Sequence, residues 1–167
     1  LPRVSVTELM REPLDVIVSL DSTLAERDSV AVSELADCDW ISVEGGFPVD
    51  DVLLSISAIT GVAPRVTQRM LDFTTIEALV AAGHGIALMP RFAVRHPRVK
   101  RLELKGVRAA RVYEALTRPR ARGAVGTVVA LLVDAGAERV CASTASKKPD
   151  DGAPTACLLY TSPSPRD

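Results

Sequence analysis

Aromatic side chains, cysteine pairs and net charge are all scarce in this sequence. Aromatic residues make up 4% of the chain, so no row of rings is available on which single-stranded nucleic acid could stack. The formal net charge is −1, which gives these residues no electrostatic footprint for binding DNA or RNA. The length of 167 residues suits one domain, or two small lobes, with enough apolar side chains to bury a core.

The cysteines and histidines do not form the patterns of metal or catalytic sites. Cys38, Cys141 and Cys157 are odd in number and widely spaced, so we expect unpaired thiols rather than zinc ligands or disulfides. The two histidines, His84 and His96, lie in no predicted cleft, and neither Gly-x-Ser-x-Gly nor His-Glu-x-x-His occurs. We therefore expect no enzyme, no metal and no cofactor.

Long hydrophobic runs are missing as well. No stretch of about 18 uncharged apolar residues occurs, so no membrane span is predicted. The chain begins at Leu1 with neither an initiator methionine nor a signal-peptide core, which we interpret as a cut from a longer protein. Residues 143–167 are rich in serine, threonine, proline and lysine, and disorder is predicted there. The final residues, from Cys157 onward, resemble translated vector or adapter sequence.

Between these ends, the patterns of strands and helices alternate. Buried strands are predicted over residues 14–20 and 85–90, a short strand over 40–43 and a strand of mixed character over 64–70. Helices are predicted over 48–60 and from Thr74 to Gly83. This order implies a parallel α/β sheet with right-handed crossovers. A connecting strand over 98–104 and a returning strand over 111–117 follow. An amphipathic helix over 124–138 then carries one apolar face, which consists of Val125, Val128, Val129, Leu132 and Val133.

Polar residues follow two of these strands at the edge where a parallel sheet binds ligands, beyond the carboxyl ends of its strands. Helix N-termini at that edge offer free N–H groups and a partial positive charge, for which a small carboxylate is the natural guest. Hydroxyl groups would add donors, and Phe73 an apolar wall. The candidate ligand-binding residues are Ser42, Glu44, Gly45, Asp72, Phe73, Thr74 and Thr75.

Simpler interpretations of these residues stay open. Thr74 and Glu77 fit a capping box, which would fully explain both of them, and Gly45 would then be only part of a turn before Pro48 in the first helical turn. Glu44 would favour an amine or a neutral polar ligand over a carboxylate, or it would simply face solvent.

The segment from Leu79 to Pro90, where a helix runs through Gly83-His84-Gly85 into a strand ending in proline, resembles the most recurrent motif of LysR-type effector domains. Three further pieces match in order: Glu12-Pro13-Leu14, Leu35-Ala36 before Trp40-Ile41, and Gly61-Val62-Ala63-Pro64. The family often has His-Pro-Leu-Ala where this chain has Ser22-Thr23-Leu24-Ala25. The Gly83–Gly85 turn joins a helix end to a strand start, opposite the predicted cleft. We therefore expect a helix cap at Gly83, close helix–strand packing at Gly85 and a surface turn at His84.

The resemblance implies an α/β fold of the type II periplasmic-binding-protein-like class, with one complete lobe on a parallel-rich sheet and an incomplete first lobe. Residues 1–38 would be a remnant of lobe one, 39–108 lobe two, 109–140 the return strand and helix of lobe one, and 141–167 a disordered tail foreign to the protein.

The same resemblance implies a function, namely the ligand-sensing domain of a bacterial, cytoplasmic LysR-type transcriptional regulator. Such a domain binds a small-molecule effector, often a carboxylate, in a cleft between its lobes. The full-length protein is expected to form homo-oligomers away from the membrane and to bind DNA through a helix-turn-helix domain absent from this sequence. Two alternatives stay open: an exported solute-binding protein of the same fold, and an enzyme with its catalytic groups in the missing half.

Overall fold

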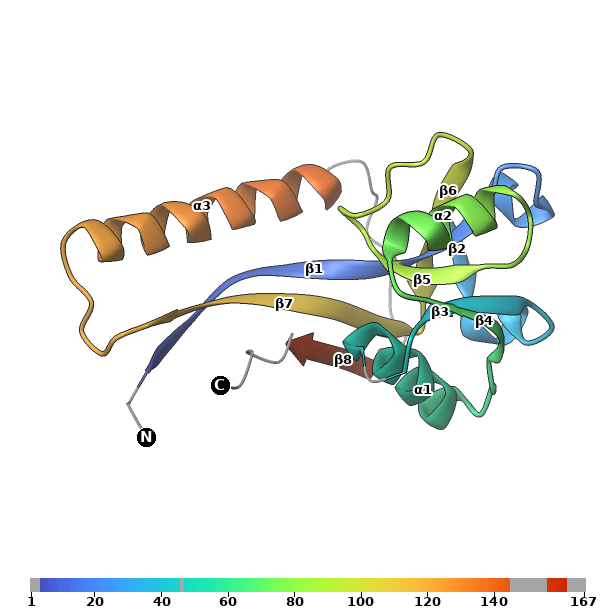
Figure 1. The fold of residues 1–167 in the computed structure, drawn as a ribbon, viewed down its shortest axis with the longest axis horizontal. Helices are drawn as coiled ribbons and strands as arrows, with labels where there is room; N and C mark the ends of the chain where they lie inside the picture. Colours follow the sequence, from blue (N-terminus) through green and yellow to red (C-terminus); the bar gives the residue numbers. More distant parts are fainter. Residues whose placement is uncertain (1–3, 46, 145–155, 162–167) are drawn as a thin grey trace. The chain divides into compact units, whose positions relative to one another are not determined.

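We describe residues 4–45, 47–144 and 156–161 in a computed structural model of the chain (Figure 1). They form two compact units. The larger consists mainly of Pro13–Ala110, and the smaller of the described parts of Leu1–Glu12 and Arg111–Gly152. The division cuts two long strands, β1 (Ser5–Ser19) and β7 (Val107–Thr117), so each of them contributes residues to both units.

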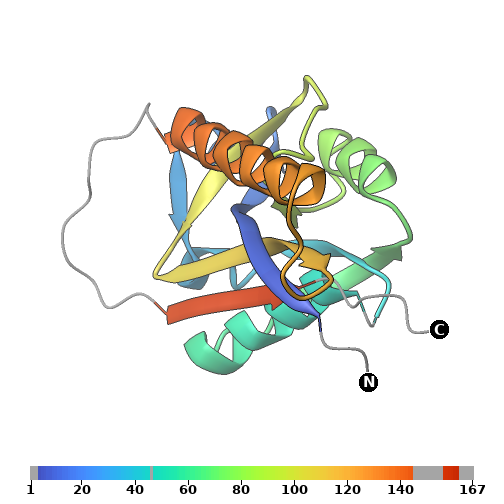
Figure 2. The same cartoon turned by 90° about the vertical axis from the view of Figure 1, so that its left-hand side faces the viewer.

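A parallel pair of strands with helices on both sides forms one half of the larger unit. The other elements of this unit are η1 (Thr23–Glu26), β2 (Ser29–Ala31), η2 (Val32–Leu35), β3 (Asp39–Val43), α1 (Pro48–Thr60), β4 (Arg65–Met70), α2 (Phe73–Ala81), β5 (Ala87–Pro90) and β6 (Val99–Lys105). Strands β3 and β4 pair in parallel, and a parallel bridge between Trp40 and Ile86 connects β3 to the segment that leads into β5. Helices α1 and α2 lie on opposite sides of these strands, as Figures 1 and 2 show. The predicted parallel arrangement is confirmed for β3, β4 and the segment at Ile86, whereas β5 itself pairs antiparallel with β1.

The second half of β1 completes the larger unit from an earlier part of the chain. It pairs antiparallel with both β5 and β6, while β2 pairs parallel with β6. Its side chains Val16, Ile17 and Val18 are fully buried at 0% exposure. The compact unit therefore starts at Pro13, within the residues 1–38 that the sequence assigned to a remnant of lobe one, and the lobe boundaries themselves stay a prediction. The unit starts this early because β1 pairs with strands far along the chain, which no local pattern reveals.

The two helices of the larger unit begin differently from each other. Helix α1 spans the predicted residues and ends at Gly61, whose φ of 72° is the left-handed cap that glycine favours. The predicted capping box of Thr74 and Glu77 is wrong, because the N-cap of α2 is Asp72. The buried carboxylate of Glu77 instead accepts the backbone N–H of Arg95 at 2.6 Å, which ties α2 to the loop after β5.

The glycine-rich turn after α2 is structural, as predicted, but one of its two roles differs. Gly83 has a φ of 82°, which confirms the expected left-handed cap. At Gly85, a Cβ would lie 2.6 Å from the backbone oxygen of Asp39. The close approach is therefore between this turn and strand β3, rather than between a helix and a strand.

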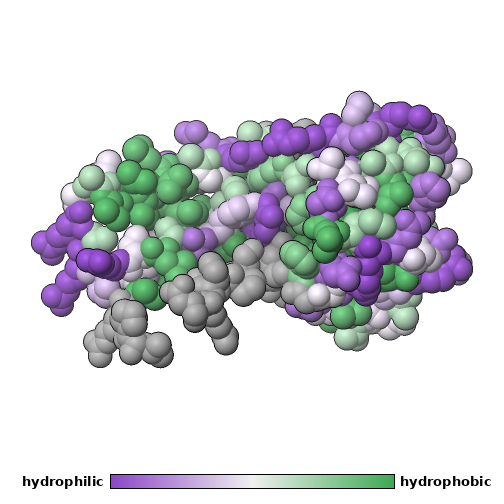
Figure 3. Space-filling model, in the orientation of Figure 1, coloured by the Kyte–Doolittle hydropathy of each residue, from purple (hydrophilic) through white to green (hydrophobic). Residues whose placement is uncertain are grey.

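In the smaller unit, helix α3 (Ala124–Thr144) packs against the first half of β1. A Cβ on Gly136 would lie 2.5 Å from the backbone oxygen of Leu9, so a glycine makes the closest contact. The predicted apolar face is only partly turned inward, with Val129 and Val133 half-buried. Its other members are about half exposed: Val125 at 51%, Val128 at 54% and Leu132 at 48%. Figure 3 shows these residues within an apolar patch over the first half of α3.

The predicted disordered tail is wrong for part of its length. Helix α3 continues to Thr144, beyond its predicted end at residue 138, and Ala156–Thr161 forms strand β8, next to β7 in the strand order. Residues 145–155 and 162–167 lie outside the described part of the chain. That the tail is foreign to the protein stays a prediction. No helix among the described residues is long and apolar enough to cross a membrane.

Candidate functional site

The two predicted ligand-binding loops leave the same edge of the larger unit. The last residues of β3 and β4, Val43 and Met70, are direct partners in the parallel register. One residue further on, the backbone N–H of Glu44 donates to the carbonyl of Met70 at 2.9 Å. The loop at Glu44 and Gly45 therefore begins beside the loop that leads to Asp72, as the strand-end rule predicted.

The loop after β3 has a buried anchor and an exposed tip. Ser42 is 5% exposed, and its hydroxyl donates to Oδ1 of Asp50 in the first turn of α1 at 2.8 Å. Glu44 and Gly45 are exposed beyond it. The hydroxyl hydrogen that the sequence assigned to a ligand is therefore committed to Asp50. Ser42 contributes to this edge by fixing that carboxylate.

An arginine that the sequence analysis missed shares the same carboxylate. Nη1 of Arg69, near the end of β4, donates to Asp50 Oδ1 at 2.7 Å and to the carbonyl of Val43 at 3.0 Å. Asp50 is 4% exposed, while the Arg69 side chain is 38% exposed. Alternation along the strand could have shown that Arg69 lies near this edge, but the candidates from this part of the chain, Asp72 to Thr75, all follow the end of the strand. Its contact with Asp50 was not visible in the sequence.

The loop after β4 ends in a carboxylate that caps the N-terminus of the following helix. Oδ1 of Asp72 accepts the backbone N–H of Thr75 at 2.8 Å, and Oδ2 accepts the Thr75 hydroxyl at 2.7 Å. Both bonds hold the pKa of the Asp72 carboxyl below its ordinary value, and the backbone bond has the larger effect. A carboxylate thus already occupies the position at α2 where the sequence expected an anionic ligand. Thr74 is exposed at this N-terminus, and Phe73 is half-buried against the core.

The two helix N-termini therefore differ in what they can offer a ligand. The N-cap residue of α1, Phe47, makes no side-chain capping bond, so no side chain occupies that end as Asp72 occupies the start of α2. At the start of α1, however, Pro48 has no N–H, and the N–H groups of Asp50 and Asp51 already donate to the carbonyl of Phe47. Exposed acidic residues stand on the two loops and in the first turn of α1: Glu44, Asp72 and Asp51. Arg69 is therefore the clearer donor for an anion at this edge, and the surface there is not broadly positive.

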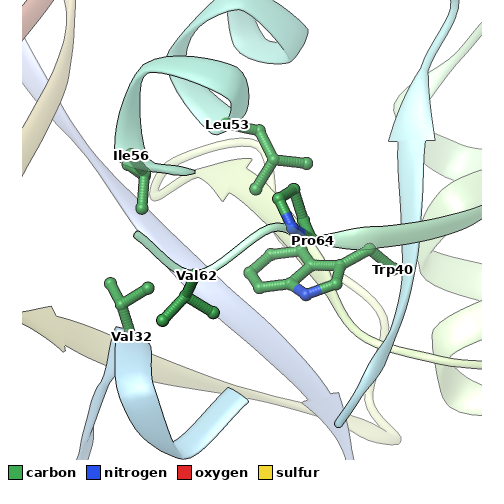
Figure 4. Close-up of a pocket in the computed structure, with 6 residues that line it drawn as sticks. All are labelled: Val32, Trp40, Leu53, Ile56, Val62 and Pro64. Carbon is green, nitrogen blue, oxygen red and sulfur yellow. The ribbon is translucent and has the colours of Figure 1, made fainter. Parts of the chain in front are cut away.

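A small apolar pocket lies at the opposite end of the strands, beside the start of β3 (Figure 4). Its lining residues are Val32, Trp40, Leu53, Ile56, Val62 and Pro64. Its cavity of about 10 Å³ has room for little more than one water molecule. The pocket is a packing feature of the core and holds none of the candidate site residues.

Two solved structures that share this fold are a regulatory domain and an effector-binding domain, each with a bound small molecule. The chain has a TM-score of 0.67 to the regulatory domain of Synechocystis CcmR in complex with 2-PG, at 17% identity, covering 81% of this chain and 68% of that one. The BenM effector-binding domain with benzoate gives 0.65 at 18% identity, covering 89% and 68%. The predicted type II periplasmic-binding-protein-like class is confirmed.

The family itself follows from the sequence comparison. The family model of the LysR substrate binding domain matches residues 1–137, and the chain belongs to this family. Among curated relatives, a hydrogen peroxide-inducible genes activator of Dickeya chrysanthemi is 29% identical over 92 residues. That match covers 55% of this chain and 30% of the relative, so the chain aligns with less than a third of the relative's length.

Proposed function

We propose that this chain is the effector-sensing part of a LysR-type transcriptional regulator and binds a small metabolite at the carboxyl ends of β3 and β4. Bound metabolite would favour one arrangement of the whole regulator and shift its population. DNA binding through a helix-turn-helix domain, homo-oligomer formation and a cytoplasmic location belong to our proposal for the longer protein.

The observation that carries this proposal is the convergence of two exposed loops on one strand edge, in a chain of this family. The pairing of Glu44 with Met70 fixes the starts of both loops side by side. The regulatory domain of CcmR forms a complex with 2-PG, and benzoate is the effector of BenM. A small anionic metabolite is therefore the ligand class that we propose for this chain.

We assign the seven candidate residues two kinds of role. Glu44, Gly45, Phe73 and Thr74 would meet the ligand from the loops, since each has exposed or half-exposed atoms there. The remaining three would hold the loops in place through the hydrogen bonds described above: Ser42, Asp72 and Thr75.

Thiol-based peroxide sensing is a second candidate, suggested by the name of the Dickeya relative. Reaction with peroxide requires a thiolate. Burial, followed by the charges of Asp37 and Asp39, raises the pKa of the Cys38 thiol. Cys38 is therefore protonated at neutral pH, which favours a non-covalent effector. A solute-binding protein or an enzyme on this fold is disfavoured by the relatives, which are transcriptional regulators, and we propose no enzymatic activity.

Thermal-shift screening of the whole chain tests the proposal. The panel contains small carboxylates, each with a matched neutral amide, together with small amines. A ligand at about 100 times its Kd should stabilise the chain by about 2.7 kcal/mol. Stabilisation by at least one compound is expected, and a complete lack of response would contradict the ligand-sensing function.

A pair of matched threonine variants locates the binding site. Thr74→Val removes an exposed hydroxyl at the proposed edge and should weaken binding of the hit. Thr60→Val removes a hydroxyl at the far end of α1, where it donates to Ile56 O at 2.8 Å, and should leave binding unchanged. Equal effects of both substitutions would place the ligand elsewhere.

A further inference from the structure

We propose that Arg69 is the residue that selects anionic effectors, through a planar carboxylate or an equivalent pair of oxygen atoms on the ligand. This inference rests on the proposed function and deepens it. One nitrogen of the guanidinium makes the hydrogen bonds that hold it, while part of the side chain is exposed at the proposed ligand edge.

The fixed part of the guanidinium is held by backbone and by a buried carboxylate. Nη1 donates to Val43 O at 3.0 Å and to Asp50 Oδ1 at 2.7 Å. Asp50 is itself held by the buried Ser42 hydroxyl at 2.8 Å. Much of the rotational freedom of Arg69 is therefore already lost before a ligand arrives, and pre-ordering of this kind lowers the entropic cost of binding.

The open part of the guanidinium carries the recognition. Within the described part of the chain, the hydrogen bonds of the Arg69 side chain all leave from Nη1. Nε and Nη2 therefore have N–H groups to offer to a ligand, and the side chain is 38% exposed. A guanidinium presents such groups in a rigid fork that matches the two oxygens of a carboxylate.

The charges around Arg69 require recognition to be directional. Asp50 neutralises the guanidinium, and Glu44, Asp51 and Asp72 add exposed negative charge. A diffuse positive field therefore does not attract anions to this edge. Discrimination between an acid and its neutral amide has to come from hydrogen bonds made by the fork, which a lysine ammonium cannot reproduce.

Strand β4 offers a matched control at its other end. Arg65 lies four positions earlier in the sequence, so substitution to glutamine changes the charge of the same strand by the same amount. Its side chain is 65% exposed and pairs with Asp39 at 2.8 Å, beside the start of β3 rather than its end. An effect of general charge would appear in both variants, whereas an effect of recognition would appear only at Arg69.

The experiment measures affinities by calorimetry on the whole chain, with benzoate, shikimate, acetate and succinate as carboxylate probes and their amides as neutral partners. At least one carboxylate should bind the chain and Arg65→Gln equally, and bind Arg69→Gln about ten- to a hundredfold more weakly. Arg69→Lys should also bind more weakly than the original chain. Because Arg69→Gln leaves Asp50 buried without its cation, Asp50→Asn combined with Arg69→Gln provides a second variant whose folding is checked by melting without ligand.

Four results would overturn the inference. Unchanged affinity in a folded Arg69 variant would show that the guanidinium does not contact the ligand. An equal loss in Arg65→Gln would show an effect of general charge. Binding of amines or neutral compounds alone would show that the effector is not an anion, while the proposed ligand-sensing function would still stand. If no compound of any class bound, the inference and the proposed function would fail together.

Discussion

Replacing Arg111 by methionine should destabilise the chain more than a change at its partner, Glu12. Glu12 is completely buried at 0% exposure, and its Oε2 accepts from Arg111 Nη2 at 2.6 Å and Nε at 3.0 Å. The Tyr113 hydroxyl donates to the same oxygen at 2.8 Å. The Arg111 side chain is 22% exposed, and its guanidinium lies 4.6 Å from the Tyr113 ring centroid. Solvent therefore reaches the cation but not the carboxylate.

This difference in solvent exposure between Arg111 and Glu12 sets the expected losses of stability. Methionine keeps the aliphatic part of Arg111 and removes the charge, and breaking a buried pair in this way costs about 3–5 kcal/mol. Glu12→Gln leaves a cation that water can reach, so the expected loss is that of a charged hydrogen bond, about 1.5–3 kcal/mol. Natural domains are stable by only about 5–15 kcal/mol, so the Arg111 variant loses a large share of the total. The double variant should be less destabilised than the sum of the two single ones.

Urea unfolding followed by circular dichroism at 222 nm measures these differences. Helix α3, with 21 residues, is longer than α1 with 13 or α2 with 9, and it belongs to the same compact unit as the Glu12–Arg111 pair. The signal therefore reports strongly on the affected unit. A loss below about 1 kcal/mol for Arg111→Met, or one no larger than that of Glu12→Gln, would refute the reasoning from burial.

Three further predictions concern helix packing, pH and thiol reactivity. Gly136→Ala should destabilise the chain, because its Cβ would lie 2.5 Å from a backbone oxygen. Gly126→Ala, with its nearest contact at 3.5 Å and its place in the first turn, should instead stabilise α3 by less than about 1 kcal/mol, and urea melts test these opposite signs. The lowered pKa of Asp72 gives stability that is present above the unfolded value of about 3.9 and lost as the pH falls through the folded value, so Asp72→Ala should flatten the acid side of a plot of Tm against pH. Because its pKa is raised, Cys38 should react with iodoacetamide at pH 7 more slowly than the exposed Cys141, as peptide mass spectrometry would show, and equal rates would contradict the assigned protonation.

Helix ends show where local sequence information was sufficient. In α1, the proline at the first turn and Gly61 at the end act through their own backbone restrictions, and the helix has the predicted bounds. In α2, the predicted pair of Thr74 and Glu77 does not form. Asp72 caps the helix, while the Glu77 carboxylate accepts from the backbone of Arg95 after β5. Because Glu77 has this tertiary partner, the local capping pattern gave the wrong residue.

At the candidate site too, one feature could be predicted from the sequence and another could not. Parallel pairing predicted correctly that the loops after β3 and β4 would lie side by side, because strand direction follows from the order of strands and helices. Whether each polar group there is already hydrogen-bonded within the protein could not be predicted. The hydroxyls of Ser42 and Thr75 are committed to carboxylates, and Arg69 makes its anchoring contacts with residues from two other elements. A list of residues after strand ends identifies the edge, but not which donors there remain available.

The glycine-rich turn and the proposed recognition residue are linked through strand β3. Gly85 allows the turn to lie against the backbone of Asp39, and Ile86 exchanges hydrogen bonds of 2.8 Å with Asp39 and Ile41 there. The other end of β3 supplies the Val43 carbonyl that holds Arg69. A side chain at position 85 would have to displace the start of β3, and a short paired strand transmits such a shift along its length. The turn lies away from the proposed ligand edge, so we expect a substitution at Gly85 to act on the Arg69 guanidinium through β3 and not through contact with a ligand.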